Sequence, residues 1–197
     1  MRRRPLWPSV LGGLGGGLGL GGSAERGART ARAPSHRYEF GLFCPVFRTH
    51  GCRLGPSEPD VAPCKPAQES CGENEVWSYG NETETMLSRL VRTRAEVLKP
   101  YIAELAANVT ATGVPTMRPL WWEFPDDPAA HGLDLQYMLG PRLLVAPVVL
   151  QGASTLSVYF PAGASWVSFW DPTVVVSGGA VREVDAPLGK TPAYWRA

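Results

Sequence analysis

The sequence lacks several features that mark large classes of protein. It has no run of about 20 consistently apolar residues, which argues against a membrane-spanning helix. Its net charge is only +1, so the overall charge points to neither nucleic acid nor an anionic membrane surface. Its four cysteines form no tight Cys-x-x-Cys pair, so we expect no metal site. With 22 Gly and 19 Pro among 197 residues, a helical bundle or coiled coil is also a poor fit.

Residues 1–37 differ in character from the rest of the chain. They carry seven Arg and only Glu25, whereas the remaining residues have a net negative charge. Three Arg near the start precede an uncharged, Gly-rich stretch with small residues at its end, which is the outline of a secretory signal peptide. Pro5, Pro8 and the many glycines weaken that outline. We expect this segment to be a leader or linker, either a signal peptide or disordered.

A long Pro-rich loop over residues 51–76 contains most of the cysteines. Cys52, Cys64 and Cys71 lie within it, and Cys44 precedes it. Four cysteines this close could form disulfides in three connectivities. In a cytosolic chain they would instead be free thiols that pack as small hydrophobic groups. The sequence leaves both alternatives open.

Two segments before residue 115 have clear secondary-structure signals. Residues 39–48 (EFGLFCPVFR) are aromatic and β-branched and are bounded by turn residues, which predicts a buried strand. Residues 81–112 place apolar side chains at helical spacing, which predicts a helix capped by Asn81. Pro100 should kink or restart this helix, and Gly113 should end it.

Asn81 and Asn108 each begin an Asn-x-Thr sequence, the pattern accepted for N-glycosylation. With the leader and the cysteine cluster, these motifs favour the secretory pathway or the extracellular space over the cytoplasm. Each of the three signals also has a simpler explanation, so the compartment stays open.

After Pro115 the pattern changes to short β-rich runs separated by turns. This spacing is typical of an antiparallel sandwich or barrel. The sequence therefore predicts the end of an α/β domain followed by a small all-β domain, with the boundary near Val114 to Arg118. The predicted strands are Leu120–Phe124, Leu143–Leu150, Leu156–Phe160, Trp166–Trp170, Thr173–Val176, Val181–Val184 and Tyr194–Arg196.

Six collinear motifs resemble those of glycoside hydrolase family 31, the α-glucosidase and α-xylosidase family. They are FGLFCPVFRTHG (residues 40–51), NEVWSYG (74–80), RTRAEVLKPY (92–101), TGVPTMRPL (112–120), EFPDD (123–127), and QYMLG with LLVAPV (136–148). Each motif alone is weak evidence for the family, but six motifs in the same order from about Tyr38 to Arg196 are specific evidence for it.

The resemblance implies the C-terminal end of a (β/α)8 barrel followed by an antiparallel β-sandwich. Residues 38–114 would be the last strand, loop and helix of the barrel, and residues 115–197 the sandwich. The implied reaction is retaining hydrolysis of an α-linked glucosyl or xylosyl residue of an oligosaccharide or glycoside, with no cofactor and no metal. The family's two catalytic aspartates lie on earlier strands, so we expect no catalytic residue in this chain and no activity from it alone.

His50 is the strongest candidate for a substrate contact. Without the motifs, a histidine in this position would be expected to form hydrogen bonds with neighbouring protein groups at the end of a strand. The resemblance implies instead that His50 donates a hydrogen bond to a sugar hydroxyl. Arg48 is expected to support the site by pairing with a carboxylate. Trp77 could face the sugar, although packing beneath the helix is favoured. Asp126 and Asp127 lie in a Pro-flanked turn, where a solvated, capping role is expected.

Two further interpretations stay open. The chain could be a non-catalytic carbohydrate-binding or interaction module, because sugar faces stack on indole rings and the sequence has seven Trp. It could also be a truncated or misassembled gene product, because residues 1–37 do not resemble a strand and helix that would precede Tyr38 in a barrel.

Overall fold

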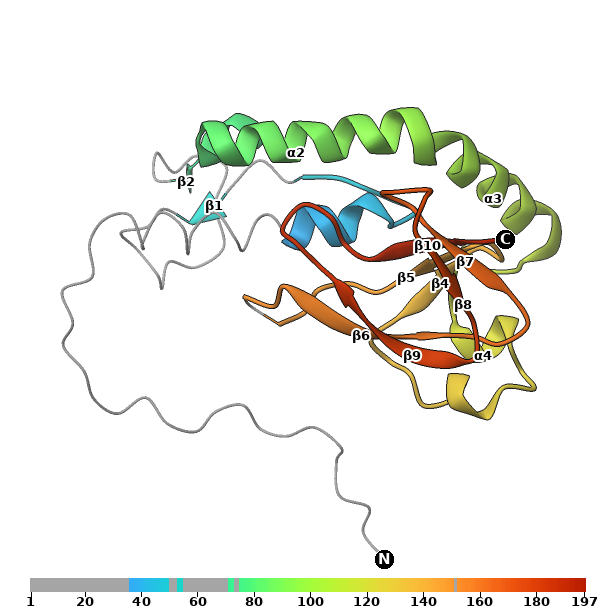
Figure 1. The fold of residues 1–197 in the computed structure, drawn as a ribbon. Helices are drawn as coiled ribbons and strands as arrows, with labels where there is room; N and C mark the ends of the chain where they lie inside the picture. The colour runs from blue at the N-terminus through green and yellow to red at the C-terminus, as the bar shows by residue number, and fades with distance from the viewer. Residues whose placement is uncertain (1–35, 50–52, 55–70, 73–74, 151) are drawn as a thin grey trace, which may run out of the picture.

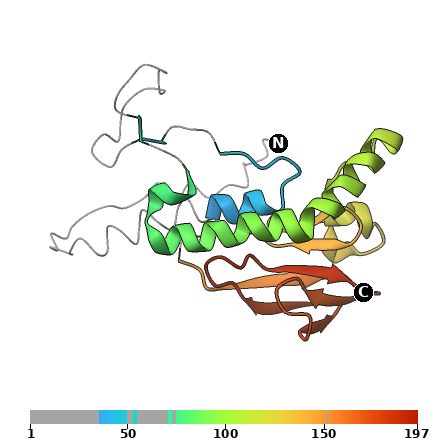
Figure 2. The same ribbon diagram turned by 90° about the horizontal axis from the view of Figure 1, so that it is seen from above.

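The computed structural model describes residues 36–49, 53–54, 71–72, 75–150 and 152–197, with the side chains of 53–54 and 71–72 left out. These residues form three layers: helices, a six-stranded antiparallel sheet, and a two-stranded ribbon (Figure 1). Seen from above, the long helix α2 (Asn81–Thr93) runs along one side of the strands, and α3 (Lys99–Thr112) turns away from the line of α2 (Figure 2).

The central sheet has the strand order β3-β4-β5-β10-β7-β8, and every neighbouring pair is antiparallel. Its strands are β3 (Met117–Pro119), β4 (Tyr137–Leu139), β5 (Leu143–Val145), β7 (Ser165–Ser168), β8 (Val175–Ser177) and β10 (Ala193–Arg196). The C-terminal strand β10 is inserted between β5 and β7, so the end of the chain closes the middle of the sheet.

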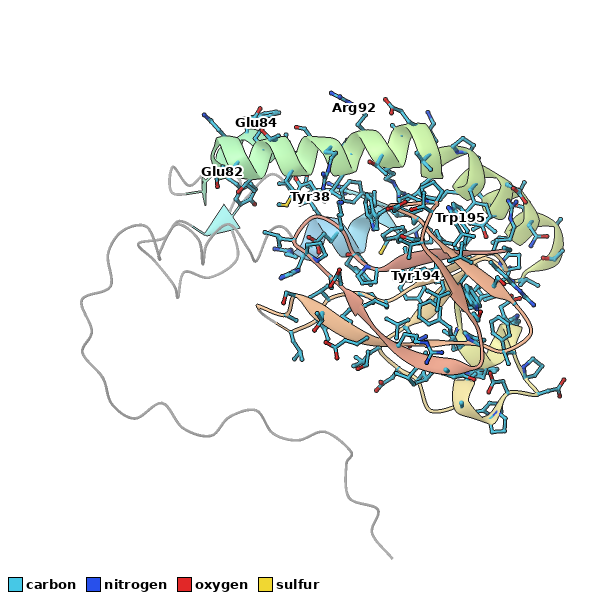
Figure 3. All side chains as sticks on the ribbon, in the orientation of Figure 1. Tyr38, Glu82, Glu84, Arg92, Tyr194 and Trp195 are labelled. Atoms are coloured by element: carbon cyan, nitrogen blue, oxygen red, sulfur yellow. The ribbon has the colours of Figure 1, made fainter. Side chains whose placement is uncertain are left out.

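Both faces of this sheet are covered, which explains the apolar character of its central strands. Successive side chains of a strand point to opposite faces. Leu143 and Val145 of β5 pack with the helices, whereas Leu144 between them packs on the opposite side. All three are fully buried, as a strand covered on both faces requires. Tyr194 and Trp195 of β10 divide in the same way (Figure 3).

The third layer is a ribbon of β6 (Thr155–Phe160) paired antiparallel with β9 (Ala180–Asp185). Its inner residues Val158 and Phe160 are fully buried in a cluster centred on Trp166. Gln136 joins this ribbon to the sheet, because its side-chain amide donates to the Tyr159 carbonyl at 2.7 Å and accepts from the Tyr159 N–H at 3.0 Å. The sheet and the ribbon confirm the predicted antiparallel β-sandwich.

The predicted long helix is confirmed, with a change of geometry in its middle. It consists of α2 (Asn81–Thr93), the π-helical η2 (Arg94–Leu98) and α3 (Lys99–Thr112), and it follows the short η1 (Val76–Tyr79). Pro100 lies in the first turn of α3, where a missing N–H is tolerated, so the predicted restart is confirmed. Gly113 ends α3 with φ 74°, as predicted. The capping prediction is wrong, because Gly80 is the N-cap and Asn81 is the first helical residue.

Two predicted strands are helices. Residues 36–42 are helical, and residues 43–49 contain no strand. The reason is that Tyr38, Glu39, Leu42 and Phe43 are all buried, a spacing that fits one face of a helix and not a strand. Residues 120–123 form the short helix α4 (Leu120–Glu123), whose Leu120 points inward while Trp121 and Trp122 remain exposed.

The strands β3 and β4 and the short η3 (Pro128–Ala130) are additions to the prediction. A small antiparallel pair, β1 (Arg53–Leu54) with β2 (Cys71–Gly72), lies within the predicted loop. Among the described residues, no helix has both the length and the apolarity needed to cross a membrane. The (β/α)8 barrel implied by the resemblance is not seen here; the described residues show a helical layer on one face of the sheet.

Candidate functional site

The segment before His50 is held by one arginine. Arg94, in the π-helical turn η2, donates hydrogen bonds to the carbonyl oxygens of Leu42 at 2.5 Å and Pro45 at 3.0 Å. A longer contact of 3.4 Å reaches the carbonyl of Gly41. A π-helical turn inside an α-helix re-aims the side chains it carries and is frequent at functional sites. Arg94 therefore fixes the path of the backbone where the helix over residues 36–42 ends.

Aromatic packing secures the next part of the same segment. The Phe47 ring lies edge-on to Tyr38 at a centroid distance of 5.5 Å, and the Arg94 guanidinium lies 5.5 Å from the centroid of the Phe47 ring. A cation above an aromatic face adds a modest attraction. The backbone up to Phe47 is thus anchored by one cation and two rings, whereas His50 itself lies outside the described residues.

The two residues expected to support the site are both exposed. Arg48 is exposed and takes part in none of the ion pairs found in the described ranges, so the expected carboxylate partner is not found there. Trp77 is 58% exposed, so the favoured packing beneath the helix is wrong. Its neighbours Val76 and Tyr79 pack against the helical core instead. A four-residue 3-10 turn points its side chains in different directions. The motif alone does not indicate whether Trp77 points toward the core or toward solvent.

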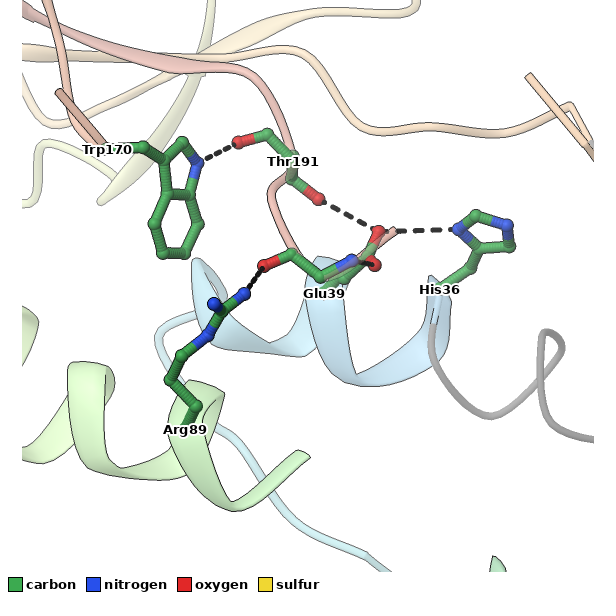
Figure 4. A network of polar contacts seen from close by, with 6 residues as sticks. His36, Glu39, Arg89, Trp170 and Thr191 are labelled. Carbon is green, nitrogen blue, oxygen red and sulfur yellow. Dashed lines mark hydrogen bonds and ion pairs between the residues drawn. The ribbon is translucent and has the colours of Figure 1, made fainter. Parts of the chain in front are cut away.

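A buried polar network that the sequence analysis missed links the helices to the sheet (Figure 4). The Glu39 carboxylate is 1% exposed and accepts hydrogen bonds from the Gly189 N–H and from the Thr191 hydroxyl, the latter at 3.4 Å. His36 lies 3.3 Å from the same carboxylate.

The network continues on both sides of Glu39. Arg89 of α2 donates to the Gly189 carbonyl at 3.1 Å, and the Trp170 indole N–H donates to the Thr191 carbonyl at 2.6 Å. Residues 150 positions apart are joined in this way. A signal was present in the sequence: a lone Glu within an aromatic run, on the face shared by Tyr38 and Leu42. A buried carboxylate needs such donors, because an unpaired one is costly.

Two carboxylates at the edge of the sandwich, Asp127 and Glu123, are already used in structural contacts. Asp127 is occupied, since it caps Ala129 N–H at 3.1 Å and accepts from the Tyr159 hydroxyl at 2.6 Å. That hydrogen bond raises the pKa of Tyr159 to about 12. Glu123 forms an ion pair with the buried Arg118. The capping role predicted for the Asp126-Asp127 turn is confirmed at Asp127.

Cys44 carries a free thiol in the structure, so the disulfide alternative finds no support at this residue. Its Sγ contacts the Phe40 carbonyl at 3.4 Å. Burial raises the pKa of the Cys44 thiol, and the charge of Arg94 acts in the opposite direction. Cys52, Cys64 and the Cys71 side chain lie outside what the structure describes, and pairing among them stays a prediction.

The two predicted glycosylation sites, Asn81 and Asn108, are both exposed on the long helix. They lie at its two ends, as the first residue of α2 and near the end of α3. No group of three or more metal-ligating side chains is found among the described residues.

Comparison with known proteins places the fold in a family. Residues 113–197 match the model for the "Glycosyl hydrolase family 31 C-terminal domain". The chain is 32% identical over 160 residues to a probable glucan 1,3-alpha-glucosidase of Arabidopsis thaliana, covering 81% of this chain and 15% of that protein. It is 31% identical over 160 residues to an alpha-xylosidase of Saccharolobus solfataricus, covering 81% of this chain and 19% of the relative.

Solved structures agree with this assignment. A family 31 dextranase of Flavobacterium johnsoniae complexed with glucose superposes with a TM-score of 0.70 at 31% identity, covering 85% of this chain and 18% of the dextranase. The chain thus spans less than a fifth of the length of these three proteins. The six motifs, the sandwich and the comparisons agree, and residues 113–197 are a C-terminal domain of glycoside hydrolase family 31.

Proposed function

We propose that this chain supplies the C-terminal portion of a retaining α-glycosidase, made of the end of a (β/α)8 barrel and the β-sandwich behind it. One observation carries the proposal. The superposition on the dextranase covers 85% of this chain, whereas the family model covers only residues 113–197. The similarity therefore extends beyond the sandwich into the helical layer, where residues 38–114 would lie in a barrel.

The proposed chemistry requires groups beyond those of this chain. A retaining glycosidase uses two carboxyl groups about 5–5.5 Å apart, one as nucleophile and one as acid and base. Two of the described carboxylates at the edge of the sandwich, Asp127 and Glu123, already have structural partners. We therefore expect the chain alone to have no hydrolytic activity. Its part would be to close the sheet and hold the segment that leads to His50.

His50 is proposed to donate a hydrogen bond to a hydroxyl of the sugar that is cleaved. A hydrogen bond that strengthens as the sugar ring flattens toward the oxocarbenium-like state lowers the activation barrier of the hydrolysis without proton transfer. The anchoring of residues 41–47 by Arg94 supports this role, because a substrate contact needs a fixed backbone. The proposed substrate is an α-linked glucosyl or xylosyl residue, since the relatives' names include an alpha-glucosidase and an alpha-xylosidase.

A chimera tests the proposal. Residues 38–197 replace the matching C-terminal portion of the Flavobacterium dextranase, and turnover is measured on aryl α-glucoside, aryl α-xyloside and dextran. We expect activity in the chimera and a loss of kcat/KM of about 10²-fold or more in its His50→Ala variant, the size of effect expected for a contact made in the transition state. The matched control is His131→Ala, because His131 is exposed and its imidazole contacts the Pro125 carbonyl.

Two results would contradict the proposal. One is a folded chimera with no activity on any of the three substrates. The other is measurable turnover by the 197-residue chain alone that His50→Ala abolishes, because this would place complete catalytic machinery within the chain.

For localisation we propose the secretory pathway. Support comes from the basic start and uncharged stretch of residues 1–22 and from the exposure of both Asn81 and Asn108. An N-linked glycan needs an exposed asparagine, and both residues meet that condition.

A further inference from the structure

Two neighbouring tryptophans on α4 are nearly half exposed in the described structure. Trp121 is 44% exposed and Trp122 is 45% exposed, although Leu120 and Phe124 on either side of them are buried in the sandwich core. The two indole rings lie 5.9 Å apart between centroids and are tilted by 48°. Neither indole N–H has a hydrogen-bond partner among the described residues. The fold therefore uses the rest of α4 for packing and leaves these two rings open.

From this geometry we infer that Trp121 and Trp122 form a binding surface for a neutral glucose oligosaccharide, separate from the proposed substrate contact at His50. A pyranose ring has apolar C–H faces that stack on an indole and a rim of hydroxyls that needs hydrogen bonds. Two tilted indoles offer two stacking faces, and their free N–H groups offer donors to the hydroxyls.

The polar surroundings fit the same ligand. The turn that follows α4 begins with Pro125, and Asp126 within it is exposed. Unlike Asp127, Asp126 takes part in no hydrogen bond or ion pair among the described residues. A free carboxylate is a strong acceptor for sugar hydroxyls. Its charge also makes an anionic ligand a poor fit next to this turn.

The size of the surface argues against a protein partner. A fully exposed Trp side chain offers roughly 250 Å², so the two rings together expose only about 200 Å². A stable protein interface buries about 800 Å² on each partner. The two rings alone are too small to hold a second copy of this chain, whereas their exposed area fits the faces of one or two sugar rings.

Titration of the 197-residue chain with isomaltotriose and with maltotriose, followed by calorimetry, tests the inference. We expect saturable binding of at least one trisaccharide with a Kd no weaker than about 1 mM. Trp121→Ala and Trp122→Ala should each weaken it about tenfold or more, by the magnitude typical of one lost stacking partner. Trp122→Phe, which keeps a ring, should lose less than about threefold. Leu188→Ala, at 42% exposure in a distant loop, should change nothing and is the matched control.

Three results would overturn the inference. They are the absence of saturable binding by both sugars, binding that both alanine variants retain, and self-association of the chain that the alanine variants abolish. Binding that His50→Ala removes and the Trp variants retain would locate the sugar at the proposed substrate contact instead, which would also overturn it. The chimera assay does not depend on these binding measurements, so failure of the proposed function can be distinguished from failure of this inference.

Discussion

Replacing Glu39 with Ala should be one of the most damaging single changes in the chain. The Glu39 carboxylate is buried and accepts the N–H of Gly189 and the hydroxyl of Thr191, both of which are themselves buried. Alanine removes the acceptor and leaves these donors without water or protein partners. A buried donor left unsatisfied costs about 1–3 kcal/mol.

The three lost contacts are not equal. Loss of the Gly189 N–H bond carries most of the effect, because a backbone donor cannot turn away to a new partner. The Thr191 bond is long at 3.4 Å, and its hydroxyl can rotate. The His36 contact is 3.3 Å with a partly exposed imidazole, so it adds little. Together we expect a loss of about 3 kcal/mol in the free energy of unfolding, or about 6–12 °C in Tm for a chain of this size.

Urea unfolding of the 197-residue chain measures this change, with Glu96→Ala as the matched control. Glu96 is exposed in η2 and takes part in no ion pair among the described residues, so its removal should change stability by less than about 0.5 kcal/mol. Glu39→Gln keeps one carbonyl oxygen and should lose less than Glu39→Ala. If Glu39→Ala loses no more than Glu96→Ala does, the network does not join the helices to the sheet as we argue.

Three further predictions concern other parts of the structure. Gly140→Ala should lose about 2–4 kcal/mol of stability in urea unfolding, because φ is +58° there and the added Cβ would overlap Leu105; a loss below about 1 kcal/mol would contradict this. The Tyr159 pKa is raised to about 12, chiefly by its hydrogen bond to Asp127. The stabilisation that Tyr159 contributes is therefore complete below pH 10 and lost as pH rises from 10 to 12. Urea unfolding across this range should show a loss of stability, and Tyr159→Phe should make that loss smaller, whereas an unchanged loss would contradict the prediction. Secreted from eukaryotic cells, the chain should show an electrophoretic shift on deglycosylation that Asn108→Gln reduces; an unchanged shift would argue against a glycan there.

The sequence predicted the elements whose signals are local. The helix from residue 81 to residue 112, its restart at Pro100 and its end at Gly113 follow from apolar spacing and from backbone rules for Pro and Gly. The strands β6, β7, β9 and β10 follow from short apolar runs between turns. These signals need no knowledge of what packs against the element.

The errors occur where composition and periodicity disagree. Residues 39–48 are rich in aromatic side chains, which favours a strand, but the buried positions Tyr38, Glu39 and Leu42 fit a helix. The strand predicted over Leu120–Phe124 is wrong for the same reason. Its aromatic content favours a strand, but Trp121 and Trp122 face solvent, and only Leu120 and Phe124, four residues apart, point inward. The burial of Glu39 had a local signal, but its partners Gly189 and Thr191 could not be predicted, because they lie about 150 residues away.

The change of sequence character near residue 115 is not a boundary between two cores. Leu139, Leu143 and Val145 of the sandwich belong to the same buried cluster as Leu87 and Leu90 of α2. The helical layer therefore buries one face of the sheet at β4, β5 and β10, and without it those strands would expose apolar side chains on that face. Since the Glu39 network crosses the same junction, packing and polar contacts both tie the helices to the sheet. The sheet can hold the helices, and through Arg94 the backbone leading to His50, in a fixed place only because the two parts share one core.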